Sequence, residues 1–153
     1  MVRSQFQPSG RRGHAVIETA LMAPWIFLLF VGILDFGFYA YAAIATQHAT
    51  RAAALYTSSS PDTAADSGGA CRYVLGALRA LPNMSGVTTC AGLPQQVSPT
   101  QPVAAGASAV TGADGNPASL VTVTYQTVPL FPIPGLMGQM TITRTTQMRV
   151  LSP

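Results

Sequence analysis

The sequence AVIETALMAPWIFLLFVGILDFGFYAY occupies residues 15–41 and contains only two charged residues, Glu18 and Asp35. Its apolar run extends from Thr19 to Leu34. A helix needs about 20 such residues to cross the hydrocarbon core of a bilayer. Aromatic side chains follow the run, and they favour the membrane interface. The stretch therefore predicts one membrane-spanning helix.

Composition and charge support this prediction. The chain has 153 residues, of which 48% are hydrophobic and 8% charged, against roughly a quarter charged in ordinary soluble domains. The formal net charge of +3 comes from Arg3, Arg11 and Arg12, because the five later arginines balance the five acids. Positive charge confined to one flank of an apolar run predicts a cytoplasmic N-terminus and an exported remainder, from about Tyr41 onward. Nucleic acid is not an expected partner.

A cleaved signal peptide is the alternative topology. Its basic start, apolar centre and the small residues of Ala40-Tyr41-Ala42 would suit signal peptidase. Glu18 lies within the hydrophobic stretch that starts at Ala15, Asp35 lies before the supposed cleavage site, and charges there weaken such a signal. We therefore favour the membrane anchor.

The residues preceding the apolar run carry a recognisable motif. Gly13 to Glu18 fit the pattern G-x-x-x-x-E after Arg11-Arg12, which is the processing signature of type IV prepilin-like proteins. The longer segment resembles the TadE-like family, pseudopilin-type components of the Tad/Flp tight-adherence pilus machinery. Usual members have Glu where this chain has Asp35. The residues that carry the resemblance are Arg12-Gly13, Glu18, Ala20-Leu21, Pro24, Gly32, Asp35-Phe36-Gly37, Ala49 to Ala53 and Met148-Arg149.

The resemblance implies a processing event and a set of partners. A prepilin-type peptidase would cut after Gly13, which leaves His14 as the new N-terminus and Glu18 as the fifth residue. Glu18 would then pair with a neighbouring subunit's N-terminal amine, although an interfacial carboxylate near the headgroups is the simpler alternative. The implied partners are other Tad pseudopilins or the pilin, the inner-membrane platform and lipid. The implied location is the bacterial inner membrane, with the C-terminal domain in the periplasm.

Three further features of the long helix are candidates for assembly contacts. Asp35 lies about 25 Å beyond Glu18 at 1.5 Å per residue, so we expect it near the outer membrane boundary as an interfacial charge or intersubunit partner. Pro24 predicts a kink that membrane helices tolerate. Small residues spaced by three or four form a smooth face for another helix, or simply an Ala-rich helix of high propensity. These are Ala42, Ala45, Ala49 and Ala53.

The exported part is expected to be a small α+β domain. We predict a leader at 1–13, one helix over 14–57 and a domain over 58–153. Within the domain, a second helix at 70–81 ends at Pro82, and alternating residues predict antiparallel strands at 120–128 and 139–150. Residues 91–118, rich in Gly, Ala, Pro and Ser, are expected to form a loop or poorly ordered insertion. The apolar connection 129–138 would touch a partner or the outer leaflet, or cover the edge of the core.

Cys71 and Cys90 are the only cysteines. Their spacing fits neither a C-x-x-C redox motif nor a zinc site. In an oxidising periplasm we expect them to form a structural disulfide.

No catalytic constellation is evident in the sequence. Neither a nucleophile with a base nor a phosphate-binding glycine motif stands in a suitable context, so we expect no enzyme, no metal and no cofactor. Two hypotheses follow. The first is a non-catalytic pseudopilin of the Tad pilus; the second is a periplasmic binding module secreted or anchored through its apolar segment.

Overall fold

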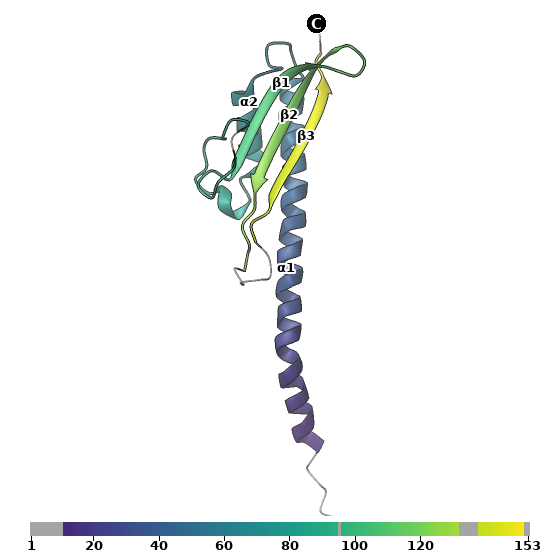
Figure 1. Ribbon diagram of the computed structural model, residues 1–153, viewed down its shortest axis with the longest axis vertical. Coiled ribbons are helices and arrows are strands. Elements are labelled where there is room, and N and C mark those ends of the chain that lie inside the picture. Colours follow the sequence, from purple (N-terminus) through teal and green to yellow (C-terminus); the bar gives the residue numbers. More distant parts are fainter. Residues whose placement is uncertain (1–10, 95, 132–137, 152–153) are drawn as a thin grey trace, which may run out of the picture.

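The computed structural model describes residues 11–94, 96–131 and 138–151, with side chains from His14 onward. Helix α1 (Arg11–Thr57) has 47 residues and forms a long stalk whose C-terminal half joins a small domain (Figure 1). The domain contains α2 (Ser67–Leu78), the short 3-10 helix η1 (Pro82–Met84), and strands β1 (Val103–Thr111), β2 (Pro117–Gln126) and β3 (Thr141–Arg149). The fold is α+β, as predicted. The proposed leader, residues 1–13, lies almost entirely outside the described part.

The sheet is antiparallel with strand order β1-β2-β3. Val103 pairs with Tyr125 in the first ladder, and Tyr125 pairs with Ile142 in the second. One face packs on the helices and the other is lined by threonines. The hydroxyls of Thr122 and Thr145 lie 3.2 Å apart across the exposed face. The alternation of Val and Thr in the sequence therefore separates the core from solvent.

The core lies between the sheet and the two helices. α1 packs against α2, β2 and β3, while α2 packs against β1. Fully buried side chains from each layer meet there, with small residues on α1 and larger ones opposite. They include Ala49 and Ala53 of α1, Val74 and Leu78 of α2, and Val103, Val121, Val123 and Tyr125 of the sheet.

Strand β1 corrects one prediction. Residues 91–118 were expected to be a loop or flexible insertion, but Val103–Thr111 form a nine-residue strand on the edge of the sheet. The expected hairpin is consequently a three-stranded sheet. The segment's sequence, VAAGASAVT, contains few residues with strong strand preference. Its strand conformation follows from pairing along the whole length of β2.

Helix α2 begins about one turn earlier than predicted, because Asp66 caps it. Its carboxylate Oδ1 accepts a hydrogen bond from the Gly69 amide at 2.9 Å, which caps the helix. Its Oδ2 accepts the Tyr56 hydroxyl at 2.7 Å. The Gly69 amide first, and the Tyr56 hydroxyl next, hold the pKa of Asp66 below its ordinary value. The helix therefore spans Ser67–Leu78 rather than the expected 70–81.

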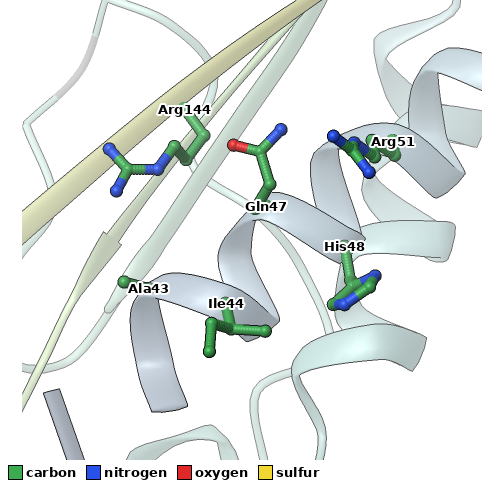
Figure 2. Close-up of a pocket in the computed structure, with 6 residues that line it drawn as sticks. All are labelled: Ala43, Ile44, Gln47, His48, Arg51 and Arg144. Carbon is green, nitrogen blue, oxygen red and sulfur yellow. The ribbon is translucent and has the colours of Figure 1, made fainter. Parts of the chain in front are cut away.

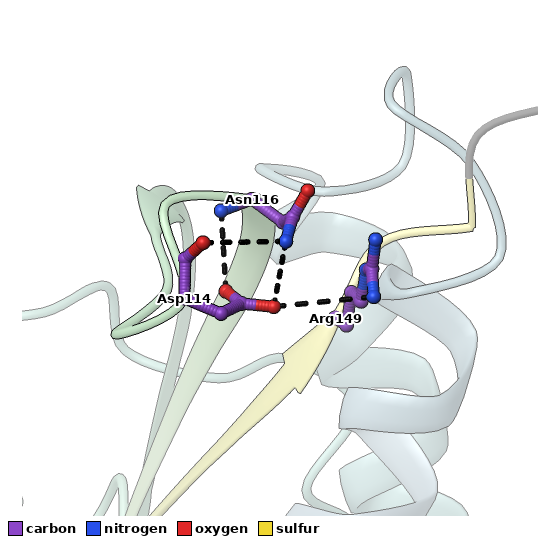
Figure 3. Close-up of polar contacts among 3 residues, drawn as sticks. All are labelled: Asp114, Asn116 and Arg149. Atoms are coloured by element: carbon purple, nitrogen blue, oxygen red, sulfur yellow. Dashed lines mark hydrogen bonds and ion pairs between the residues drawn. The ribbon is translucent and has the colours of Figure 1, made fainter.

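A polar turn joins β1 to β2. Asp114 accepts hydrogen bonds from the Asn116 side chain at 2.8 Å and from the Asn116 amide at 3.1 Å (Figure 3). These bonds lower the pKa of Asp114. Arg149 at the end of β3 lies 3.9 Å from the same carboxylate, and both side chains are largely exposed. Gly115 takes the positive φ of 76° that this turn requires.

The predicted disulfide is present. Cys71 on α2 and Cys90 in the segment before β1 are bonded, with their Cα atoms 5.9 Å apart. The bond fastens the linker between α2 and β1 to the helix. It closes a loop that includes the core residues Val74, Leu78, Leu81 and Met84.

Candidate functional site

The N-terminal half of α1 is an exposed apolar rod. Within residues 14–57 the helix is long and apolar enough to cross a membrane, and only 6% of its most apolar 18-residue window is buried. Side chains as large as Trp25 and Phe27 are more than 60% exposed. A soluble domain rarely leaves so much contiguous apolar surface uncovered. The exposed set comprises Val16, Ile17, Leu21, Met22, Trp25, Ile26, Phe27, Leu28, Leu29, Phe30, Ile33, Leu34 and Phe36.

The residues of the processing motif lie at the free end of this rod. Gly13 is part of the helical backbone, and side chains are described from His14 onward. His14 and Glu18 are exposed and four residues apart, one turn along the helix. The domain does not cover Glu18, so its carboxylate remains available to a group outside the chain.

Pro24 lies inside α1, which continues through it. Its missing N–H leaves the carbonyl of Ala20 without the usual helical partner. One turn earlier, the hydroxyl of Thr19 donates to the Ala15 carbonyl at 2.8 Å. The stalk therefore contains one weakened backbone position within its exposed half.

Asp35 has an intrachain partner. Its side chain is 0% exposed, and Oδ1 accepts hydrogen bonds from the backbone amides of Leu130 at 3.0 Å and Phe131 at 3.4 Å. The other oxygen, Oδ2, is buried and has no hydrogen-bond partner among the residues that the structure describes. A buried carboxylate is costly unless donors compensate it. Asp35 was expected to be an interfacial charge or an intersubunit partner, whereas it binds the β2–β3 connection of its own chain.

The β2–β3 connection has two described arms: residues 127–131, which bind Asp35, and residues 138–140. Tyr39 binds the second arm. Its ring is 5% exposed, and its hydroxyl donates to the Gly138 carbonyl at 2.8 Å. The arms themselves meet where the Thr127 amide donates to the Met140 carbonyl at 2.8 Å. The sequence did not single out Tyr39 for this role. Its only signal was a spacing of four residues from Asp35, which puts both side chains on one helix face.

The alanine stripe faces the chain's own domain. Ala42, Ala49 and Ala53 are 0% exposed and belong to the core, and Ala45 packs against it. Small side chains let α2 and the sheet approach α1 closely. The stripe was predicted to be a smooth face for another helix, and in the structure α2 and the sheet of the same chain pack against it.

A different small residue lies on the exposed side. Gly32 is at the centre of an apolar hollow of about 450 Å³ whose walls are Trp25, Leu28, Leu29, Ile33 and Phe36. A Cβ atom built on Gly32 would meet no atom within 4 Å. The hollow is therefore a feature of the outer surface of α1, and packing within the chain does not require it.

A second hollow lies between α1 and the edge strand β3. This shallow pocket of about 290 Å³ is lined by His48 and Arg51 from α1 and by Arg144 from β3, together with Ala43, Ile44 and Gln47. Figure 2 shows the guanidinium of Arg144 pointing away from His48. The pocket does not assemble an acid-base pair around a nucleophile. Among the described residues, no three His, Cys, Asp or Glu side chains are arranged to hold a metal.

Comparisons with known proteins bear on the same part of the chain. Searches of curated proteins and of solved structures found no match for it. A family model described as TadE-like protein matches residues 13–55, which begin at the glycine of the processing motif and end in the packed half of α1. This match suggests a component associated with the Tad pilus. Over residues 13–55, which make up most of its long helix, the chain is similar to the TadE-like family.

Proposed function

We propose that the chain is a membrane-anchored, non-catalytic pseudopilin that takes part in assembling the Tad/Flp pilus. The observation that carries the proposal is the division of α1 into two halves. One half exposes large apolar side chains over most of its surface, and the other supports the exported domain. A subunit that is inserted in the bilayer before assembly and then packs beside other subunits needs such a helix.

Glu18 is proposed to be the recognition group of assembly. It is the only acidic residue on the exposed apolar half, because Asp35 is buried by the chain itself. A carboxylate among apolar side chains is unfavourable in hydrocarbon without a cation. The N-terminal amine of a neighbouring subunit, created by cleavage after Gly13, would supply that cation. The proposed partners are a prepilin-type peptidase, other pseudopilins or the pilin, and the inner-membrane platform.

The alternative, a periplasmic module released by signal peptidase, is disfavoured by the packing of α1. Cleavage after Ala42 would remove Asp35 and Tyr39, together with their hydrogen bonds to the β2–β3 connection. It would also cut the helix at a fully buried residue of the core. The exported domain includes part of α1, so an N-terminal half in the membrane and a C-terminus in the periplasm suit it better.

Replacement of Glu18 tests this function directly. In Glu18→Ala cells we expect pilus assembly to be lost while the protein stays in the membrane at its normal level, because Glu18 touches nothing in its own domain. Thr19→Ala is the matched control: it lies on the same turn, and its hydroxyl bonds only the adjacent Ala15 carbonyl. Normal piliation in Glu18→Ala cells would refute the assembly role of Glu18.

A further inference from the structure

The two described arms of the β2–β3 connection, residues 127–131 and 138–140, extend beyond the sheet beside α1 (Figure 1). Leu130 and Phe131 in its first arm are 43% and 40% exposed, and Met140 at the end of its second arm is 50% exposed. Residues 127–140 contain no charged side chain. We propose that the first arm of this connection is a second membrane contact, in which Leu130 and Phe131 rest on the outer leaflet beside α1.

The depth of the connection is set by Asp35. If the hydrocarbon begins near Ala15, about 20 helical residues end it near Leu34. Asp35 follows directly, and its carboxylate binds the amides of Leu130 and Phe131. Both apolar side chains are thereby held at the level where the membrane-spanning part of α1 ends. The second clamp, from Tyr39 to Gly138, fixes the other arm one turn higher.

Val31, one turn below Asp35, is also buried. Val31 lies one turn nearer the N-terminus on the same helix face and is 1% exposed, while Phe30 and Ile33 beside it are 58% and 68% exposed. The chain therefore covers one face of α1 within the apolar run and leaves the others open.

Lipid fits this surface better than a second protein does. The exposed side chains of the arm continue the exposed apolar surface of α1, for which lipid is the proposed environment. The one charge at this level, Asp35, is shielded and hydrogen-bonded. Apolar side chains next to a shielded polar group suit the boundary between headgroups and acyl chains. The inference rests on α1 spanning the membrane, as proposed above.

Tryptophan fluorescence in lipid vesicles tests the contact. The full chain has a single tryptophan, Trp25, so Trp25→Phe with Phe131→Trp reports on the connection alone. In vesicles of lipids brominated near the headgroup end of the acyl chains, we expect blue-shifted emission that loses most of its intensity. The control replaces Leu55 with Trp in the same background. Leu55 is 64% exposed and about 30 Å farther along α1, so its reporter should remain red-shifted and unquenched.

Each outcome decides the matter. Unquenched, red-shifted emission from the Phe131→Trp variant would overturn the proposal, and unquenched but blue-shifted emission would overturn it too, because the side chain would then be buried in protein and not in lipid. The wild-type protein separates this failure from failure of the anchor itself. If Trp25 is quenched by lipids brominated near the bilayer centre while the Phe131→Trp reporter is not, α1 spans the membrane and only the loop contact is wrong.

Discussion

Asp35 and Tyr39 lie one helical turn apart on α1 and bind opposite arms of the β2–β3 connection, one as an acceptor and the other as a donor. The sheet is thereby tied to the stalk at two points below the hydrophobic core. Both bonds join residues about 95 or more positions apart in sequence. These two bonds mark where the exposed apolar half of α1 ends and the packed domain begins.

Loss of the Asp35 carboxylate should release the first arm. In Asp35→Ala, the amides of Leu130 and Phe131 lose a charged acceptor, at a local cost of about 1.5–3 kcal/mol for hydrogen bonds to a charged group. We expect their hydrogen exchange, measured in detergent micelles, to accelerate. Tyr39→Phe serves as the control, because it frees only the second arm. Unchanged protection of both amides in Asp35→Ala would contradict this role.

Overpacking of the alanine face should destabilise the domain. Ala53 is fully buried against α2 and the sheet, so Ala53→Leu should cost about 1–3 kcal/mol of unfolding free energy. Leu55→Ala, on the exposed side of the same helix, should change stability by no more than about 0.5 kcal/mol. Denaturant titration in micelles measures both. Equal effects would mean that this face of α1 is not a core face.

The disulfide should contribute measurably to the stability of the exported domain. Cys71→Ser opens a loop closed over 19 residues, which should lower the unfolding free energy by about 3 kcal/mol. Denaturant unfolding of the oxidised wild type and the variant gives this difference. Identical gel migration of the wild-type protein with and without reductant would show instead that the bond does not form.

Asp66 should make the stability of the domain depend on pH in the acid range. Its folded pKa is lower than the unfolded value of 3.8, chiefly through the Gly69 amide. The stabilisation is therefore complete above the unfolded pKa and is lost as the pH falls through the lower folded pKa. Asp66→Asn keeps a capping oxygen but cannot titrate, so its melting temperature should fall less on acidification. Parallel acid profiles would contradict this assignment.

Filling the hollow around Gly32 should impair assembly without impairing folding. Because a Cβ atom at this exposed position meets no atom within 4 Å, Gly32→Leu should leave stability and membrane level unchanged. A neighbouring helix that docks there would be displaced, so piliation should fall. Gly37→Leu is the matched control: its side chain also meets open space, but Gly37 does not line the hollow. Normal piliation in Gly32→Leu would exclude the hollow as a contact.

The apolar periodicity of the sequence predicted those elements whose own residues have a clear helical or strand repeat. The long helix, α2, and the strands β2 and β3 follow apolar spacing that survives in the structure within a few residues. β1 escaped prediction because its Ala, Gly and Ser residues become a strand only when β2 pairs with them. The start of α2 was displaced because the capping role of Asp66 was not recognised in a segment that looked like a solvated turn.

The candidate site was predictable in its residues and less so in their partners. The motif around Gly13 and Glu18 is local in sequence, and the family match covers it. Asp35 stood out as a charge at the end of an apolar run, but its acceptor role depends on amides 95 residues away. The alanine stripe gave the correct spacing for close helix packing, whereas only the folded domain reveals that the packed neighbour belongs to the same chain.

The most direct measurement is the N-terminal sequence of the mature protein, together with the cell fraction that contains it. A helix shared by membrane and domain, trimmed as a pseudopilin, predicts a start at His14 in the membrane fraction. A start at Met1 or Val2 there would leave a simple anchor without processing. A soluble periplasmic protein that starts at Ala43 would contradict the account, because the apolar half of α1 would then be absent from the working protein.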